Sequence, residues 1–423
     1  MTPHPSRLRD RHVAAVVSRL AALPLLALSM LLLTHAAQAA EPYAAKSTCA
    51  GYPGISLTVP AGWCAGLVAD ARDGLRMPRR LLEVAPHRFW IVDMGNWEPR
   101  RGRLLEMRTD IARGQPGRVR VLASGLDRPH GLAKGPDGHI YVGEAGTVWR
   151  TPVGEAVQRQ DVVQDLPADG AHPLKELAFT PDGRLLVNVG STTDACRGDD
   201  QQQPLPCAEL AGPKPRAAVY VATFSGKDFA LQSFKPLATG LRNSLGLATT
   251  TARDGTVRLW QAENSVDYTD ATLPAEELNE LKEGASYGWP TCVGDAKGKA
   301  VPARGYEGRA RCAEHTAAHA AWPAHVAPLQ LLAAPKEVST GPFAQRLLAV
   351  WHGYRANGHR IVAWRLDEQG RPKGAREELV SGWQAQAGVR PMGTPAGISF
   401  DTEGRLWVVE DRNKTVIVIA RQP

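Results

Sequence analysis

The sequence has neither a C-x-x-C pair nor a C-x-x-C-H motif among its six cysteines. The first absence argues against a thiolate metal site, and the second means that the chain holds no covalent haem of its own. A dense lysine and arginine run is also missing beyond residues 1–39, which supply four arginines and one aspartate toward the net charge of +7. Nucleic acid is therefore not an expected partner. Helical periodicity is scarce, and only Ala275 to Lys282 is expected to form a short helix or turn.

An apolar run from Leu20 to Leu33 follows a basic N-terminal region, and Ala37-Gln38-Ala39 offers small residues for cleavage. The basic residues are Arg7, Arg9, Arg11 and Arg19. This pattern predicts a signal peptide over residues 1–39 and a periplasmic or secreted protein that starts near Ala40. The run is too short and too early for a convincing membrane span, so no stable span is expected after processing. An uncleaved N-terminal anchor is the alternative.

The cysteines fall in three pairs that are local in the sequence: Cys49/Cys64, Cys196/Cys207 and Cys292/Cys312. In an oxidising compartment, an even number of cysteines is typical of disulfides, here closing local loops. Six cysteines allow fifteen pairings, and the sequence alone does not choose among them. We expect three disulfides, with metal thiolates as the competing interpretation.

Four segments share one small module, in which a turn containing Asp-Gly or Glu-Gly lies between runs of alternating apolar residues. These segments are 133–144, 178–190, 251–263 and 399–411. Aspartate or glutamate followed by glycine accepts the positive φ of a tight turn, and β-branched and aromatic residues pair across strands. Each module is therefore a predicted β-hairpin.

Two further segments, 84–94 and 343–353, keep the strand pattern but lose the turn signature. Four clear modules and two degenerate ones make six, which predicts an all-β protein with a six-bladed β-propeller fold. The propeller is expected to be a single domain over residues 40–423, with the disulfide-containing segment 41–75 leading into it.

The segments 191–216 and 264–335 are long and rich in polar residues, proline and glycine. They are expected to be connections on one face, where propellers place their functional residues. The most specific part of the sequence, from Gly240 to Pro290, contains G-L-R-N-S-L-G-L-A, W-Q-A-E-N-S and E-E-L-N-E-L-K-E-G-A-S-Y-G-W-P. Upstream, His172 precedes the strand pattern L-A-F-T-P-D-G-R-L-L-V-N-V-G.

Together these strings resemble the quinoprotein sugar dehydrogenases of the soluble glucose dehydrogenase and L-sorbosone dehydrogenase group, and the resemblance extends roughly from Leu75 to the end. It implies a six-bladed propeller that holds pyrroloquinoline quinone (PQQ) and Ca²⁺ over its central channel. It also implies oxidation of the aldehyde or hemiacetal carbon of a sugar. Because the chain lacks a haem motif, the electron acceptor is expected to be a separate exported partner, a cytochrome or a quinone.

The resemblance implies roles for several polar residues. His172 stands where the family places the general base, which takes the proton of the anomeric hydroxyl as hydride leaves for the quinone. Arg242 would stabilise charge that develops on the quinone, and Asn243 would bond the cofactor edge. Lys175 occupies a place where sorbosone-type relatives often carry a basic residue. Taken alone, His172 fits a structural histidine, the Arg-Asn pair a strand cap, and Lys175 a solvated side chain.

Two metal sites are implied by the same resemblance. The backbone carbonyls of Ser265 and Val266 match those that ligate the catalytic calcium, although the soluble glucose enzymes carry Gly-Pro there. Glu277 and Tyr287 match a second, structural calcium site that uses a carboxylate and a backbone oxygen. Without the resemblance, Glu277 would be an ordinary solvated acid.

The match is weaker for the remaining cofactor carboxylates. Arg355 fits a cofactor-binding role with a small insertion, whereas Arg390 stands earlier than the family register. Thr394 and Ala396 occupy the places that are basic in the soluble glucose enzymes. Either the intervening loop bulges and returns Arg390 to the site, or this contact is missing.

Ser191 stands where those enzymes have an aspartate that orients the histidine, and Asp194 could take that role from the loop. His130 lies at the corresponding edge of the second blade, where it could contact substrate or be structural.

Two other functions remain open. One is a propeller without cofactor that binds a glycan, a peptide or a partner protein. The other is a metal-dependent lactonase, in which Glu144, Glu263 and Asp411 converge on one central metal.

Overall fold

The computed structural model describes residues 43, 47–110, 115–198, 202–386 and 390–422. The predicted signal peptide over residues 1–39 lies outside these ranges. Within the described ranges, no helix has the length and hydropathy that crossing a bilayer requires.

Six antiparallel sheets of similar size make up the fold, and we number these blades in chain order. Blade 1 contains β4 (Pro78–Ala85), β5 (Arg88–Asp93), β6 (Gly102–Asp110) and β7 (Gln115–Leu126). Blade 2 contains β8 (Gly131–Lys134), β9 (Ile140–Gly143), β10 (Val148–Thr151) and β11 (Gln160–Val163). Blade 3 contains β12 (Leu177–Phe179), β13 (Leu185–Val189), β14 (Ala218–Ser225) and β15 (Ala230–Thr239).

The remaining blades follow the same plan. Blade 4 contains β16 (Gly246–Thr251), β17 (Val257–Glu263), β18 (Glu276–Glu280) and β21 (Ala320–Trp322). Blade 5 contains β22 (Pro328–Ala333), β23 (Arg346–Trp351), β24 (Arg360–Leu366) and β25 (Pro372–Val380). Blade 6 contains β26 (Pro395–Phe400), β27 (Leu406–Glu410), β28 (Thr415–Arg421) and β3 (Trp63–Ala69), extended by β2 (Tyr52–Gly54) and β1 (Ser47–Cys49).

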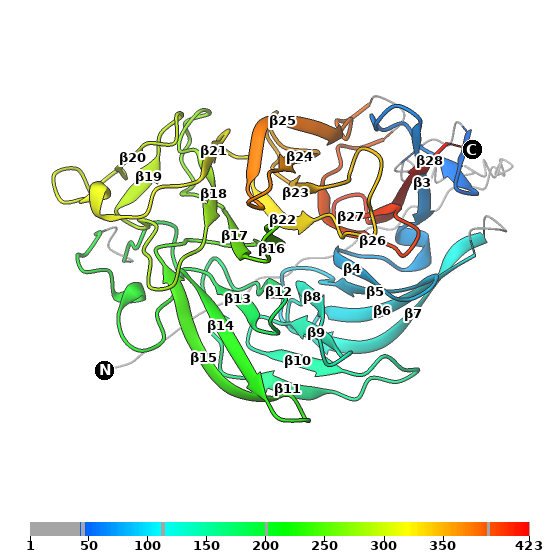
Figure 1. Cartoon of the computed structure of the whole chain (residues 1–423), viewed down its shortest axis with the longest axis horizontal. Coiled ribbons are helices and arrows are strands. Elements are labelled where there is room, and N and C mark those ends of the chain that lie inside the picture. Colours follow the sequence, from blue (N-terminus) through cyan, green and yellow to red (C-terminus); the bar gives the residue numbers. More distant parts are fainter. Residues whose placement is uncertain (1–42, 44–46, 111–114, 199–201, 387–389, 423) are drawn as a thin grey trace, which may run out of the picture. The chain divides into compact units, whose positions relative to one another are not determined.

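The first strands of the blades contact one another in a closed ring, in the order β4, β8, β12, β16, β22, β26 and back to β4. Figure 1 shows the blades arranged around this ring. The predicted six-bladed β-propeller is therefore confirmed. A two-stranded sheet, β19 (Cys292–Gly294) with β20 (Ala300–Pro302), and three short 3₁₀ turns (Ala71–Asp73, Ala208–Leu210 and Cys312–Glu314) lie outside the blades.

All six sequence modules overlap the first two strands of a blade or the turn between them. In the clear modules, glycines such as Gly183 and Gly255 have φ values of 85° and 88°, as the Asp-Gly turn requires. In the degenerate modules, His87 and Gln345 take up the left-handed conformation instead, with φ values of 60° and 53°. In blade 1 the left-handed conformation of the turn is thus preserved without a glycine, whereas the longer connection of blade 5 also contains Gly341 with a φ of 88°.

The N-terminal segment closes the ring rather than merely leading into it. Its strand β3 pairs antiparallel with β28, from Trp63 opposite Arg421 to Ala69 opposite Val416. Because β3 completes the sheet formed by β26, β27 and β28, blade 6 contains both ends of the propeller. The Cys49–Cys64 disulfide fastens β1 next to β3.

The segment Ala275 to Lys282, expected to be a helix or turn, contains the strand β18, so this prediction was wrong. Its glutamates and leucines favour a helix in isolation. In the protein, Glu277 pairs with Glu263 of β17 on one side and with Ala321 of β21 on the other. Pairing on both sides and the burial of Leu278 outweigh the local preference.

The three expected disulfides are present, with the pairing Cys49–Cys64, Cys196–Cys207 and Cys292–Cys312. The last two stabilise the long connections, which pack together in one apolar cluster. This cluster includes Ala195, Cys196, Cys207, Val266, Trp289, Val293 and Tyr306. The two long connections, which the sequence predicted to lie on one face, thus also pack against each other.

Candidate functional site

Most of the polar residues that the sequence singles out lie at one end of the blades, together with His352, which the sequence did not single out. His130, His172, Arg242, Asn243 and Thr394 precede the first strand of a blade, whereas Glu144, Ser191, Ser265, His352 and Asp411 follow a second strand. In an antiparallel blade, the start of the first strand and the end of the second lie side by side. We call this end of the propeller the channel face.

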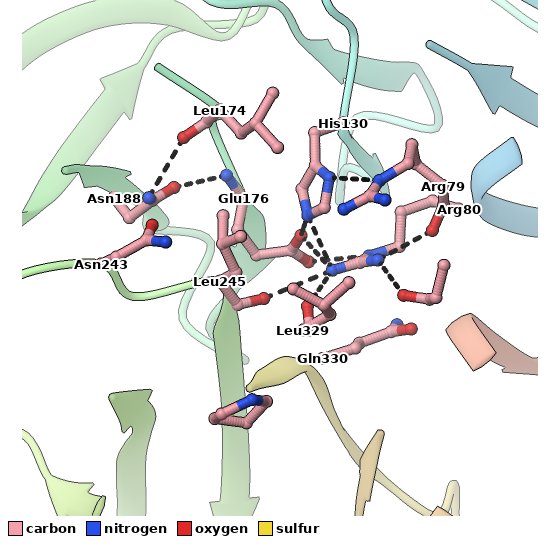
Figure 2. A network of polar contacts seen from close by, with 12 residues as sticks. Arg79, Arg80, His130, Leu174, Glu176, Asn188, Asn243, Leu245, Leu329 and Gln330 are labelled. Atoms are coloured by element: carbon pink, nitrogen blue, oxygen red, sulfur yellow. Dashed lines mark hydrogen bonds and ion pairs between the residues drawn. The ribbon is translucent and has the colours of Figure 1, made fainter. Parts of the chain in front are cut away.

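Arg80 of β4 fills the axis of the propeller below this face. Its side chain is buried, and its guanidinium donates to Glu176 Oε2 at 2.6 Å and to the carbonyl of Ala396 at 2.7 Å (Figure 2). Altogether it contacts all five other blades, through His130, Glu176 and the carbonyls of Leu245, Leu329 and Ala396. One side chain therefore holds the inner ends of the blades together and forms the floor of the site.

His130 belongs to this axial network and is fully buried. Its Nδ1 accepts from Arg79 Nε at 3.2 Å, while its Nε2 lies 3.2 Å from Glu176 Oε2. Burial and the two neighbouring guanidinium groups of Arg80 and Arg79 hold the pKa of His130 well below its ordinary value. Because both ring nitrogens are engaged and the side chain is inaccessible, His130 has a structural role and no substrate contact.

His172 is held in one tautomer by Ser191. Its Nδ1 lies 3.0 Å from the carbonyl oxygen of Ser191 and 2.9 Å from its Oγ, which itself donates to the carbonyl of Thr193 at 2.6 Å. Since both Ser191 oxygens act as acceptors, Nδ1 carries the proton and Nε2 is the basic nitrogen. Burial and the charge of Arg242 lower the pKa of His172 to about 3, so the ring is neutral at neutral pH.

Arg242 lies beside His172 and is 3% exposed. Its Nη2 pairs with Asp267 Oδ2 at 2.7 Å and with Asp194 Oδ1 at 2.8 Å. Its Nη1 donates to the carbonyl of Asn264 at 3.0 Å. Asp194 therefore partners Arg242, and the orienting role suggested for it toward His172 is taken by Ser191.

Asn243 offers an unused acceptor next to Arg242. Its backbone carbonyl accepts from Asn264 Nδ2 at 3.0 Å, but its buried side-chain Oδ1 has no hydrogen-bond partner. Figure 2 shows this side chain facing the network without a contact to the other residues drawn. A buried amide oxygen without a donor is unfavourable by about 1–3 kcal/mol, which a ligand that donates a hydrogen bond would relieve.

The cations that the sequence assigns to the cofactor are dispersed. Lys175 is fully buried and donates to the carbonyls of Pro167 at 2.8 Å and Pro173 at 2.6 Å. Burial lowers its pKa to about 7. Arg355 is exposed and donates to the carbonyl of Asp270 at 3.2 Å, on the neighbouring connection of blade 4. The structure therefore does not bring either of these two side chains into a hydrogen bond with the described residues around Arg242.

Arg390 is turned into blade 6. It is 4% exposed, its guanidinium lies 5.1 Å from the ring centroid of Tyr43, and none of its side-chain nitrogens has a hydrogen-bond partner. The hydroxyl of Tyr43 donates to Glu410 Oε2 at 2.6 Å. Arg390, which the sequence places earlier than the family register, thus lies against Tyr43 of the N-terminal segment.

The residues predicted to bind metal lie on or beside blade 4. Ser265 N donates to Glu276 Oε2 at 2.6 Å, and the carbonyl of Val266 accepts from Tyr268 N at 3.0 Å. The hydroxyl of Tyr287 donates to the carbonyl of Glu280 at 2.6 Å, and its own backbone oxygen accepts no hydrogen bond from another residue of the described ranges.

Glu277 is buried without a cation beside it. Its closest polar contact is Asn279 Nδ2 at 3.4 Å, and burial raises its pKa to about 7. The buried Oδ1 of Asn279 also has no partner. A carboxylate without a neighbouring cation and an amide oxygen without a donor are suitable ligands for a hard cation such as Ca²⁺.

Glu144, Glu263 and Asp411 do not converge on a common centre. Each is bonded within its own part of the ring: Glu144 accepts from Trp149 Nε1 at 2.7 Å, and Glu263 accepts from Gln261 Nε2 at 2.6 Å. Over the described ranges, the one group of at least three close metal-ligand side chains is Cys196, Cys207 and Glu209, whose cysteines form a disulfide. The arrangement does not support the lactonase alternative.

The sequence missed a second buried polar group, which joins blades 1, 5 and 6. His352 Nε2 lies 3.1 Å from both carboxylate oxygens of Asp411, and Thr394 Oγ1 donates to Asp411 Oδ1 at 3.1 Å. Arg79 completes the group with an ion pair to Asp411. Burial alone would raise the pKa of Asp411, but His352, Arg79 and Thr394 hold it well below its ordinary value. The sequence feature that could have revealed this group is its place in the blades. His352 and Asp411 directly follow the second strand of a blade, as Asn264 does.

A family model described as TrAA12-like matches residues 57–422. The chain is similar to a solved Trichoderma reesei carbohydrate-active enzyme of family AA12, with 20% identity, a TM-score of 0.67 and coverage of 89% of this chain and 100% of that chain. It is also similar to the holo form of the pyranose dehydrogenase PQQ domain from Coprinopsis cinerea, with 20% identity, a TM-score of 0.67 and coverage of 88% and 99%.

A third similar structure is the PQQ-bound aldose sugar dehydrogenase from Streptomyces coelicolor, with 16% identity, a TM-score of 0.53 and coverage of 86% and 99%. A comparison with curated protein sequences finds no match. The neighbours confirm the predicted resemblance to quinoprotein sugar dehydrogenases at the level of the fold. Because the family model covers nearly the whole propeller, the chain belongs to the TrAA12-like family.

Proposed function

We propose that this chain is a quinone-dependent sugar dehydrogenase that oxidises the aldehyde or hemiacetal carbon of a sugar. The observation that carries the proposal is His172, fixed by Ser191 with a basic Nε2, beside Arg242 and the unpaired Oδ1 of Asn243. Similarity to a pyranose dehydrogenase PQQ domain and to a PQQ-bound aldose sugar dehydrogenase supports PQQ as the cofactor. When bound, PQQ with Ca²⁺ supplies the hydride acceptor.

His172 acts as the general base. As the carbon–hydrogen bond of the substrate breaks, Nε2 takes the proton of the hydroxyl on the same carbon, which becomes a carbonyl. The neutral ring is ready for this role at neutral pH because burial and Arg242 lower its pKa to about 3. Negative charge that arrives with the ligand offsets the charge of Arg242 and strengthens the base.

Arg242 and Asn243 hold the cofactor. The planar guanidinium fork suits carboxylate or quinone oxygens, and Asn243 Oδ1 accepts from a ligand N–H. Asp194 and Asp267, which pair with Arg242, have side chains that are 38% and 79% exposed. Exposed ion pairs are weak, so an anionic ligand can displace these carboxylates.

Three further cations were assigned to the cofactor by the resemblance. Arg355 reaches over the neighbouring loop from an exposed position, where it can approach a ligand. For Lys175 to contribute, its ammonium must leave the carbonyls of Pro167 and Pro173. Arg390 must likewise leave the ring of Tyr43.

Calcium is assigned to the carbonyls of Ser265 and Val266 at the cofactor, and to Glu277 with the backbone oxygen of Tyr287 as a structural site. The carboxyl group of Glu277, whose pKa burial raises to about 7, and the buried, unpaired Oδ1 of Asn279 support the second site. Electrons then pass to a separate exported acceptor, a cytochrome or a quinone. The three disulfides support an oxidising compartment.

The test is titration of the purified mature protein with PQQ, with and without calcium, followed by dye reduction on a panel of aldoses. Calcium-dependent binding with sugar-driven dye reduction is the expected result. Absence of binding in saturating calcium would favour the second candidate, a cofactor-free propeller that binds a glycan or protein. The full pairing of Arg242 and the inward position of Arg390 are the observations that favour this alternative.

A further inference from the structure

A cavity of about 480 Å³ opens on the channel face between blades 6 and 1. It is lined by Arg76, Met77, Gly95, Tyr354, Asp411, Arg412 and Lys414. These residues come from the approach to β4, the connection after β5, the connection after β23 and the connection between β27 and β28. Its volume lies within the range of about 300–1,000 Å³ that is typical of small-molecule sites. None of these residues figures in the proposed reaction.

The cavity carries uncompensated positive charge. Arg76, Arg412 and Lys414 are all exposed, and none of their side chains forms an ion pair with a described residue. The one acidic group in the lining, Asp411, is already engaged by Arg79, His352 and Thr394. Three cations therefore line a cavity in which the one carboxylate is already paired with other groups. The resulting positive potential favours binding of an anion.

The cavity also has an aromatic wall. Tyr354 is 56% exposed, and its ring lies 5.1 Å from that of His352, with the Arg412 guanidinium 5.2 Å from its centroid. Aromatic rings held in this way at the mouth of a polar cavity offer flat surfaces on which the C–H face of a sugar ring can stack.

We propose that this cavity binds a carboxylated sugar, so that the preferred substrates are uronic acids or acidic oligosaccharides. Arg412, Lys414 and Arg76 take the carboxylate, and Tyr354 takes the sugar ring. Arginine binds a carboxylate through two parallel hydrogen bonds, and such charge-assisted bonds are the strong ones. The inference rests on the proposed function for the reaction, but binding in the cavity does not depend on the quinone.

The test compares binding of trigalacturonate and of its neutral counterpart galactotriose to the purified mature protein, by calorimetry and without added quinone. The wild type is expected to bind the acidic trimer at least about tenfold more tightly, as one charge-assisted contact predicts. Arg412→Gln with Lys414→Gln should abolish this preference. Raising NaCl from about 0.05 to about 0.5 M should weaken it, because exposed charges are screened.

Arg253→Gln is the matched control. Arg253 is equally exposed but lies in the turn between β16 and β17, at the end of blade 4 opposite to the channel face, where it pairs with Glu368 at 3.1 Å. This variant should keep the preference for the acidic trimer, and circular dichroism should show all variants folded. Equal binding of the two trimers by the wild type, or a preference that survives the double substitution, would overturn the proposal.

A separate titration of both variants with PQQ distinguishes the two sources of carboxylate, because the cofactor itself is a tricarboxylate. The double variant is expected to bind PQQ as the wild type does. If it loses PQQ affinity and keeps the preference for the acidic trimer, the cavity serves the cofactor and the proposal fails. If the wild type does not bind PQQ but shows the acidic preference, the proposed reaction fails while the binding site stands.

Discussion

The carbonyl oxygen of Ser191 lies 3.0 Å from Nδ1 of His172 and decides which nitrogen of the imidazole is basic. A carbonyl accepts only, so the arrangement survives replacement of the serine side chain. An aspartate in that position would also orient the ring, but it would add a negative charge and raise the basicity of the histidine. This chain instead places the ring beside Arg242 with an uncharged partner.

Replacing His172 by alanine tests its assignment as the base. We expect His172→Ala to keep PQQ and calcium binding and to lower turnover at least about a hundredfold, because a positioned base contributes that much. Dye-reduction kinetics and a PQQ titration measure the two effects separately. Ser191→Ala, which retains the backbone acceptor, is the control and should lose much less. Near-normal turnover in His172→Ala would show that His172 is not the general base.

Calcium should stabilise the protein through Glu277. A cation that binds only the folded state raises the melting temperature, and a buried carboxylate without a cation is the group to receive it. We expect the melting temperature of the wild type to rise in millimolar calcium and to fall in EDTA, whereas Glu277→Gln responds to neither. Glu307→Gln, on an exposed loop, serves as the control. A calcium response in Glu277→Gln equal to that of the wild type would place the ion elsewhere.

Arg80 should be decisive for stability, since its guanidinium joins all six blades. Arg80→Met leaves the buried Glu176 carboxylate without its cation and several buried carbonyls without a donor, and we expect a loss of about 3–5 kcal/mol in the free energy of unfolding. Urea unfolding measures it. Adding Glu176→Gln to Arg80→Met should recover part of the loss, because the uncompensated carboxylate is removed. Additive losses in the double variant would show that the pair is not coupled.

Lys175 should make stability depend on pH. Burial lowers its pKa to about 7 from an ordinary 10.5, so between these values the unfolded chain binds a proton that the folded chain lacks. The free energy of unfolding therefore rises with pH in this window, by up to about 1.4 kcal/mol per pH unit.

Lys175→Met removes the contribution of this lysine to the pH dependence of the free energy of unfolding. Urea unfolding at about pH 7 and about pH 9.5 should show the wild type gaining stability relative to the variant as pH rises. Lys282→Met, on an exposed turn, should leave the pH dependence unchanged. Parallel pH dependences for wild type and Lys175→Met would mean that the lysine keeps its proton in the folded protein over this range, and the prediction would be wrong.

The fold was predictable where its signals are local. Asp-Gly and Glu-Gly turns between alternating apolar residues mark the first hairpins of four blades, and the strand around Trp90 marks another without that turn. Pairing of β3 with β28 was not predictable, because it joins residues more than three hundred positions apart and Trp63 to Ala69 carries no turn signature. The segment Glu276 to Glu280 was wrongly predicted because its local preference is helical, whereas pairing with two neighbouring strands makes it a strand.

The candidate site divides in the same way. His172, Arg242 and Asn243 stand at strand entries that the sequence pattern locates, and the structure places His172 and Arg242 close together on one face. The group of Asp411, His352 and Arg79 depends on contacts between three blades, which no spacing within one segment reveals. The side-chain direction of Arg390 likewise depends on Tyr43, from a distant part of the chain.

The pairing of β3 with β28 has a consequence for how the protein is made. Strand β3 is synthesised near the start of the chain and its partner β28 at the end, so blade 6 stays incomplete until β28 has emerged. Until then β3 and β27 both present unpaired edges, which attract other strands. During maturation, closure of the ring therefore competes with misassembly through these edges. A chain truncated before Thr415 lacks β28 and cannot close blade 6.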